Sequence, residues 1–174
     1  IDECEGIPSS SVYRHRFGSL LRAYQLVGYE PDRGYEYLEV NKRLREVHPR
    51  VVREVVAAML DLGDSVVQDK ETELFQVNEE FSVSLIIARC QRTPAGAYRW
   101  GIRLDRVLRP DITVAVRMDE VNQLPMDYYL LPTIDMTLPK LRLAEQNGLH
   151  FDANRFDTLN YLYGMARRAR IKEA

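Results

Sequence analysis

The spacing of apolar residues changes at Gly63, and this change constrains the fold more than any other feature of the chain. Before Gly63, apolar residues recur at threes and fours, the spacing of an amphipathic helix; they are Val40, Leu44, Val47, Val51, Val55, Met59 and Leu62. After it, short runs rich in Val, Ile, Phe and Tyr are typical of strands. This order predicts an α+β fold in which helices flank a sheet.

The strand-like runs of the middle third are residues 65–68, 74–78, 81–89, 98–104 and 112–117, and 128–131 adds a short final one. Short turns separate them, such as the hairpin turn predicted at residues 93–96. The sheet is therefore predicted to be mixed and mainly antiparallel. Helices are predicted over residues 38–62, with a break or new first turn at Pro49, over 138–147 and over 155–171.

The N-terminal part predicts two short helices joined by a Gly-Ser pair. The first covers residues 11–17 and stops at Gly18; Ser19 caps the second, at 20–27, which Gly28 ends. These are the dimensions of a helix-turn-helix, whose own first helix is expected to be partly cut away. The predicted domains are therefore residues 1–34, a helix-turn-helix DNA-binding segment, and residues 35–174, an α/β accessory domain.

Composition narrows the function classes. The formal net charge is −2, and no apolar run approaches the roughly 18 residues that cross a bilayer, so a membrane partner is not expected. Cys4 and Cys90 lie far apart and form no CxxC pair, which favours two thiols in a reducing cytoplasm. Nothing in the sequence indicates a cofactor or a structural metal. The acidic, helix-like phrase that opens the chain suggests a piece of a longer protein.

Residues 9–24 form a basic, hydroxyl-rich segment. It carries Arg14, His15, Arg16 and Arg22, and no acidic residue stands between Glu5 and Glu30. Serine and tyrosine hydroxyls and arginines bind phosphate oxygens, and arginine also reads base edges. The predicted contacts with double-stranded DNA are Ser10, Ser11, Tyr13, Arg14, Arg16 and Arg22, with Arg22 touching the backbone from the second helix. The alternative is a solvated basic helix.

The run from Pro8 to Tyr24 resembles the small helix-turn-helix repeats found beside homing endonucleases. Its hydroxyl-rich start is followed by an aromatic, basic residues and Arg16-Phe17-Gly18-Ser19, and the segment ends at Gly28-Tyr29. Three longer phrases, residues 24–29, 111–119 and 127–132, resemble the C-terminal extension of proteobacterial serine recombinases of the resolvase/invertase type. That second similarity covers nearly the whole chain.

The recombinase resemblance implies a function in DNA recombination, within a mobile element. The catalytic serine would lie in a separate N-terminal domain of the same protein, which this chain lacks. The chain itself would bind DNA, position that catalytic domain on its site and have no catalytic residue of its own. A homo-oligomer is a possible further partner. A protein-interaction module of the recombinase is a further alternative.

Acidic residues of the predicted sheet point to a different function. Asp105, Asp111, Asp119 and Glu120 lie at strand ends, and the Pro110-Asp111 pair is typical of the restriction-endonuclease-like fold, whose carboxylates hold a catalytic divalent metal. The Glu-x-Lys part of that signature is missing, because no lysine occurs between Lys70 and Lys140. The alternatives are a divergent nuclease using Asp105 and Asp111, a degenerate nuclease-like scaffold, or acids that cap turns and pair with arginines.

The same region is rich in arginine, with residues 89, 92, 99, 103, 106, 109 and 117 all Arg. Arginine donates two parallel hydrogen bonds to a phosphate, so these residues are candidates for DNA contact. Arg–Asp pairs on a sheet surface explain them equally well. Ser-His-Asp and Cys-His catalysis find no support, because His15, His48 and His150 lie in different predicted elements.

Overall fold

The computed structural model describes residues 8–29, 36–104 and 107–167 and divides the chain into two compact units, residues 1–42 and 43–174. The first unit contains α1 (Ser10–Phe17) and α2 (Leu20–Leu26), as the sequence predicted within one residue at each end. The next helix, α3 (Glu36–Asp61), begins in the first unit and continues into the second. The proposed domain boundary at residue 34 stays a prediction.

Helix α3 runs without interruption through Pro49, so the predicted break there is wrong. Its buried residues form one stripe at helical spacing: Leu44, Val47, Val51, Val55 and Met59. Pro49 itself is exposed and removes one hydrogen-bond donor from the helix. Burial of the apolar stripe on both sides of Pro49 stabilises the helix across that gap.

The larger sheet has six strands in the order β1-β2-β3-β6-β7-β9. Their bounds are β1 (Val66–Gln68), β2 (Phe75–Val77), β3 (Phe81–Ala88), β6 (Ile112–Met118), β7 (Pro125–Pro132) and β9 (Arg155–Phe156). The pair β3–β6 is parallel and every other pair is antiparallel. The fold class predicted from the sequence, α+β with a mainly antiparallel sheet and flanking helices, is confirmed.

The smaller sheet consists of β4 (Cys90–Arg92), β5 (Tyr98–Arg103) and β8 (Lys140–Leu143), in that order and all antiparallel. The hairpin turn predicted at residues 93–96 joins β4 to β5, as the bond from the Thr93 N–H to the Ala97 carbonyl shows. The helix predicted at 138–147 is wrong. Leu141 and Leu143 are buried whereas Lys140 and Arg142 are exposed, which is the alternation of a strand.

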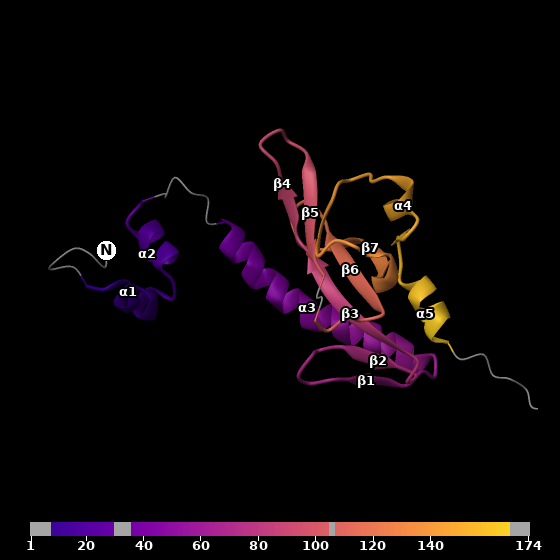
Figure 1. Ribbon diagram of the computed structural model, residues 1–174. Helices are drawn as coiled ribbons and strands as arrows, with labels where there is room; N and C mark the ends of the chain where they lie inside the picture. The colour runs from indigo at the N-terminus through magenta and orange to yellow at the C-terminus, as the bar shows by residue number, and fades with distance from the viewer. Residues whose placement is uncertain (1–7, 30–35, 105–106, 168–174) are drawn as a thin grey trace, which may run out of the picture. The chain divides into compact units, whose positions relative to one another are not determined.

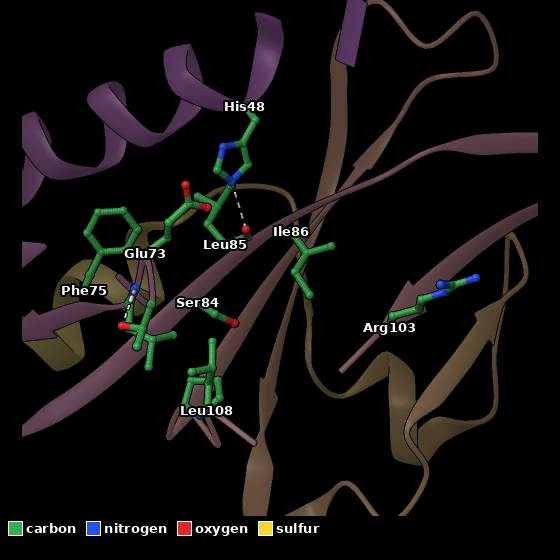
Figure 2. Close-up of a pocket in the computed structure, with 11 residues that line it drawn as sticks. His48, Glu73, Phe75, Ser84, Leu85, Ile86, Arg103 and Leu108 are labelled. Carbon is green, nitrogen blue, oxygen red and sulfur yellow. Dashed lines mark hydrogen bonds between the residues drawn. The ribbon is translucent and has the colours of Figure 1, made fainter. Parts of the chain in front are cut away.

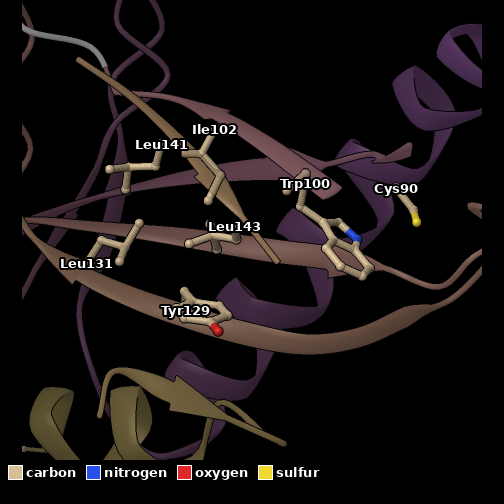
Figure 3. Close-up of a cluster of buried hydrophobic side chains, with 9 residues drawn as sticks. Cys90, Trp100, Ile102, Tyr129, Leu131, Leu141 and Leu143 are labelled. Carbon is tan, nitrogen blue, oxygen red and sulfur yellow. The ribbon is translucent and has the colours of Figure 1, made fainter. Parts of the chain in front are cut away.

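The two sheets pack face to face, and their shared core is shown in Figure 3. Trp100, Ile102, Leu141 and Leu143 come from the smaller sheet, and Ala115, Tyr129 and Leu131 from the larger one. Helix α3 passes beside β3 (Figure 1), where the His48 Nε2–H donates to the Leu85 carbonyl at 3.1 Å. From β3, Ala88 and Ile86 pack in the core that the two sheets share.

The C-terminal part contains the short helix η1 (Thr133–Asp135), α4 (Leu149–Asp152) and α5 (Asn160–Ala166). The helix predicted at 155–171 is correct only over α5, because residues 155–156 form β9. Within the described ranges, no helix is long and apolar enough to cross a membrane.

Candidate nucleic-acid interface

The helix pair α1–α2 is built around a tight joint. Gly18 has φ +79°, a conformation that residues with a side chain rarely adopt, and Ser19 follows as the N-cap of α2. The Ser19 hydroxyl accepts a hydrogen bond of 3.1 Å from the Arg22 N–H. Ring stacking of Tyr13 on Phe17, 6.4 Å between centroids, orders the C-terminal half of α1.

The six residues predicted to contact DNA lie on different sides of this pair. At about 100° per residue, Arg14 and Arg16 are about 200° apart around α1, so they point in different directions. Ser11 is exposed and lies about 140° around α1 from the Tyr13–Phe17 side, whereas the exposed Arg16 lies beside that side. Arg14 is also exposed but lines a hollow that α1 forms with α2. Arg22 is exposed on α2.

Two of the six residues predicted to contact DNA are only partly accessible, because the helix pair itself covers part of each. Tyr13 is half-buried against Phe17, and Ser10, the first residue of α1, is half-buried as well. The sequence reasoning did not select His15, which is exposed between Ser11 and Arg16 on the outer side of α1. Helical spacing alone could have identified it, because residues 11 and 15 are four apart.

The described residues of the helix pair α1–α2 carry positive charge and include no acidic residue. Among the residues that the structure describes, no carboxylate forms an ion pair with Arg14, Arg16 or Arg22. The Arg16 guanidinium lies over the Phe17 ring, 5.8 Å from its centroid. Glu39, at the beginning of α3, lines the same hollow as Arg14. The exposed side of α1 that contains Ser11 and His15, between Arg14 and Arg16, thus presents its polar groups to solvent.

The acidic residues of the predicted nuclease site do not come together in the described part of the chain. The Asp111 carboxylate accepts bonds from the Ser82 N–H and hydroxyl, both at 2.7 Å, which tie the starts of β3 and β6 together. Asp119 accepts from the Gln123 N–H at 2.6 Å, and Glu120 from the Tyr98 hydroxyl at 2.7 Å. Asp105 lies outside the described residues.

These contacts determine what the carboxylates can do. The two hydrogen bonds from Ser82, first the backbone N–H and then the hydroxyl, lower the pKa of Asp111 and keep its exposed side chain ionised. Within the described residues, no three His, Cys, Asp or Glu side chains converge as metal ligands.

A cavity that the sequence did not predict lies at the edge of β3 (Figure 2). Strand β2 pairs only with residues 81–83 of β3, so the edge beyond them is open, and His48 hydrogen-bonds to Leu85 there. The cavity measures about 230 Å³, and its polar lining includes His48, Glu73, Ser84 and Arg103. Pro110, next to Asp111, lines it as well.

One sheet arginine has a structural role. Arg117 is fully buried, and its guanidinium pairs with Asp127, with Nε–Oδ1 at 2.6 Å and Nη2–Oδ2 at 2.5 Å. It also lies over the Trp100 ring, 4.4 Å from the centroid, and Arg155 makes a second bond to Asp127 at 2.8 Å. For Arg117, the prediction of an Arg–Asp pair is therefore confirmed, and the alternative of DNA contact is excluded because the side chain is fully buried.

The fold and these surfaces identify the chain as an α+β protein that carries a basic helix pair. No family model matches the chain, and no curated protein matches it either. One solved structure is similar, "The structure of a bacterial homing endonuclease: I-Ssp6803I", with a TM-score of 0.40 and 14% identity over 66% of this chain and 86% of that chain.

These comparisons correct the family assignment made from the sequence phrases. The prediction of a serine recombinase extension, with its roles in recombination and as a resolvase, is wrong: the structural match is a homing endonuclease, and no match is a recombinase. The prediction that a recombinase's N-terminal catalytic domain is a partner of this chain is therefore wrong as well. The segment at residues 24–29 covers the end of α2, and those at 111–119 and 127–132 cover most of the core strands β6 and β7. Apolar patterns like those of β6 and β7 occur in many sheets, so they do not identify a family.

Proposed function

We propose that this chain binds double-stranded DNA through the α1–α2 helix pair. The observation that carries the proposal is the exposure of Arg14 and Arg16 on α1, because no described carboxylate forms an ion pair with either guanidinium. Exposed guanidinium groups on a small helical unit suit a phosphate backbone, because each displaces condensed counterions from DNA. We also propose a cytoplasmic location, because a reducing compartment keeps thiols such as that of Cys90 free.

The geometry suggests separate roles for the proposed contact residues. Ser11 and His15 lie within about 40° of each other on the exposed side of α1, between Arg14 and Arg16, and bind phosphates together with Arg16. Arg14, about 200° from Arg16, reaches a base edge or the opposite strand. Arg22 contacts the backbone from α2. Ser10 and Tyr13 contribute at the margin of the interface, because both are half-buried.

The experiment measures duplex binding by the full chain as a function of salt. A fluorescently labelled random duplex of about two helical turns is titrated by anisotropy between 50 and about 200 mM KCl. We expect affinity to fall steeply with salt. Arg16→Ala should reduce the slope of log Kd against log salt by about 1. On a duplex selected from the random pool for tight binding, Arg14→Ala should weaken binding by about 1–3 kcal/mol, because its contact with a base edge is lost.

The matched control is Arg53→Ala, which removes an equally exposed arginine from α3. It should leave both affinity and slope unchanged. Affinity that does not depend on salt, or equal losses in Arg16→Ala and Arg53→Ala, would exclude the helix pair as the DNA-binding element.

A metal-dependent nuclease is the second candidate, and one observation favours it. Asp111 is an exposed, ionised carboxylate beside the cavity that His48 and Glu73 line. The candidate residues are Asp105 and Asp111. Plasmid DNA is incubated with the chain and Mg²⁺ or Mn²⁺, and Asp111→Ala is compared with Asp119→Ala, whose carboxylate closes a local turn. Cleavage lost only in Asp111→Ala supports the nuclease; absence of cleavage in the wild-type chain rejects it.

A further inference from the structure

The outward-facing residues of the three strands in the smaller sheet carry positive charge, and none of these strand residues is acidic. Trp100, Ile102, Leu141 and Leu143 are buried in the core (Figure 3). Because successive strand residues point to opposite faces, their neighbours along β5 and β8 point outward. The outward residues of the three strands are Gln91, Arg99, Gly101, Arg103, Lys140 and Arg142. Four of these six are cations and none is an acid.

The strand register concentrates these charges. Arg103 lies directly opposite Lys140, and Gly101 opposite Arg142. Two like charges at directly opposite positions repel each other and destabilise a sheet. Within the described residues, no carboxylate forms an ion pair with Arg99, Arg103, Lys140 or Arg142. A ligand of opposite charge would relieve this repulsion.

The shape of the face suits an extended polyanion. Gly101 lies at its centre, where a Cβ would meet no heavy atom within 4 Å, so the middle of the face is flat and open. Glycine within a strand often marks a place where another backbone approaches closely. Arg99 and Arg103 are about 13 Å apart along β5 at about 3.3 Å per residue, so the cations are spread along the strand.

We infer that this face, defined by Arg99, Arg103, Lys140 and Arg142, is a second DNA-binding surface that grips the phosphate backbone of a duplex. No aromatic residue is among the outward strand residues, whereas binding of single strands relies on bases that stack on aromatic rings. The ligand is therefore duplex and the contact independent of sequence. The inference rests on the proposed function in one respect: it takes DNA as the ligand of the chain.

Gly101 allows a test that adds one charge with little steric disturbance. Gly101→Glu places a carboxylate among the four cations, and Gly101→Gln introduces a neutral side chain of nearly the same shape. Both are compared with wild type by circular dichroism and then titrated as full chains with a labelled 20-base-pair duplex at several KCl concentrations. Gly101→Glu should weaken binding by about tenfold or more at low salt, and Gly101→Gln by less than about twofold.

A second pair of variants removes charge instead of adding it. Arg103→Gln combined with Lys140→Gln should reduce the slope of log Kd against log salt by about 2, since each lost phosphate contact contributes about 0.9. Single-stranded DNA of equal length should bind more weakly than the duplex. Equal affinities for duplex and single strand would overturn the assignment to a duplex backbone.

The outcomes separate this inference from the proposed function. If Arg16→Ala weakens binding while Gly101→Glu and the double variant do not, the sheet surface is rejected and the helix pair stands. If the sheet variants alone weaken binding, the helix pair is rejected and the sheet stands. Poly-glutamate that displaces the duplex as well as unlabelled DNA does would overturn the inference and point to an acidic protein as the ligand.

Discussion

Arg117 carries a fully buried charge whose only described carboxylate partner, Asp127, is buried as well. Burial by itself would lower the pKa of Arg117, but the hydrogen bonds and negative charge of Asp127 outweigh it and raise that pKa. Arg117 Nη1 also donates to the Ala144 carbonyl at 2.5 Å, so the pair connects β6 and β7 to the end of β8. Such a pair becomes costly when one partner is removed.

Asp127→Asn is therefore expected to destabilise the protein by about 3–5 kcal/mol, because a guanidinium is left buried without a counter-charge. Urea unfolding followed by circular dichroism measures the change. The control is Glu54→Gln, which breaks the exposed Arg50–Glu54 pair at 4.0 Å and should cost no more than about 0.5 kcal/mol. Equal effects of the two substitutions would show that the Arg117–Asp127 pair contributes little to stability.

Cys90 is a buried thiol next to acidic residues. Burial first, and then the negative charges of Glu120 and Asp119, raise the pKa of the thiol to about 11. Because the thiolate is the reactive form, only about one thiol in a thousand is reactive at pH 8, against about one in four for an ordinary cysteine. The raised pKa also means that folding favours the neutral thiol, so this contribution to stability is present below pH 9 and is lost as pH rises towards 11.

A Cys4→Ser variant, in which Cys90 is the sole thiol, should therefore react very slowly with a disulfide reagent at pH 8. The rate should rise steeply above about pH 10 or when urea unfolds the chain. Labelling is followed by absorbance, with the Cys90→Ser variant reporting Cys4 separately. Rapid labelling of native Cys90 at pH 8 would show that the site opens readily.

Helix α3 contains a proline at an exposed interior position, where it removes a backbone donor. Pro49→Ala restores that donor and should stabilise the protein by about 1–3 kcal/mol, measured by thermal unfolding. The matched control is Pro94→Ala in the β4–β5 turn, where the Gly96 N–H donates to the Thr93 carbonyl and proline suits the second position. That change should destabilise the protein by about 0.4–1 kcal/mol. A loss of stability in Pro49→Ala would mean that Pro49 fits the helix better than alanine.

The elements that the sequence predicted best are those with one clear period and a defined end. Helix α1 ends at the C-cap Gly18 and helix α2 begins at the N-cap Ser19, and β6 is rich in β-branched residues. Strand β8 was missed because Leu138, Leu141 and Leu143 fit both a helical and a strand pattern over so few residues. Only its pairing with β5, which lies about forty residues away, selects the strand.

The same limit applies to the candidate sites. Arg99, Arg103 and Arg117 are indistinguishable in sequence, yet the first two point outward and Arg117 is buried against Trp100. Strand register decides this, and register depends on partners distant in the chain. The basic segment of α1 was found because its charge is local, and His15 was overlooked although helical spacing puts it beside Ser11.

The two units differ in how much core they contain. In α1 no residue is buried, and in α2 only Ala23 is, whereas β6 has six consecutive buried residues from Thr113 to Met118. Local unfolding depends on buried apolar contacts, so the helix pair should open far more often than the sheets. A DNA-binding element of this kind gains order from its ligand, since binding to the folded form alone stabilises it.

Hydrogen–deuterium exchange of the whole chain tests this difference. Amides of α1 and α2 should exchange within seconds to minutes, while those of β6 and β7 exchange only through global unfolding. Duplex DNA should slow exchange in α1 and α2, and Arg16→Ala should reduce that protection without changing β6. The Arg53→Ala variant, as control, should behave like wild type. If α1 is as protected as β6 without DNA, the helix pair is a rigid part of the fold; if DNA leaves its exchange unchanged, the pair does not bind DNA.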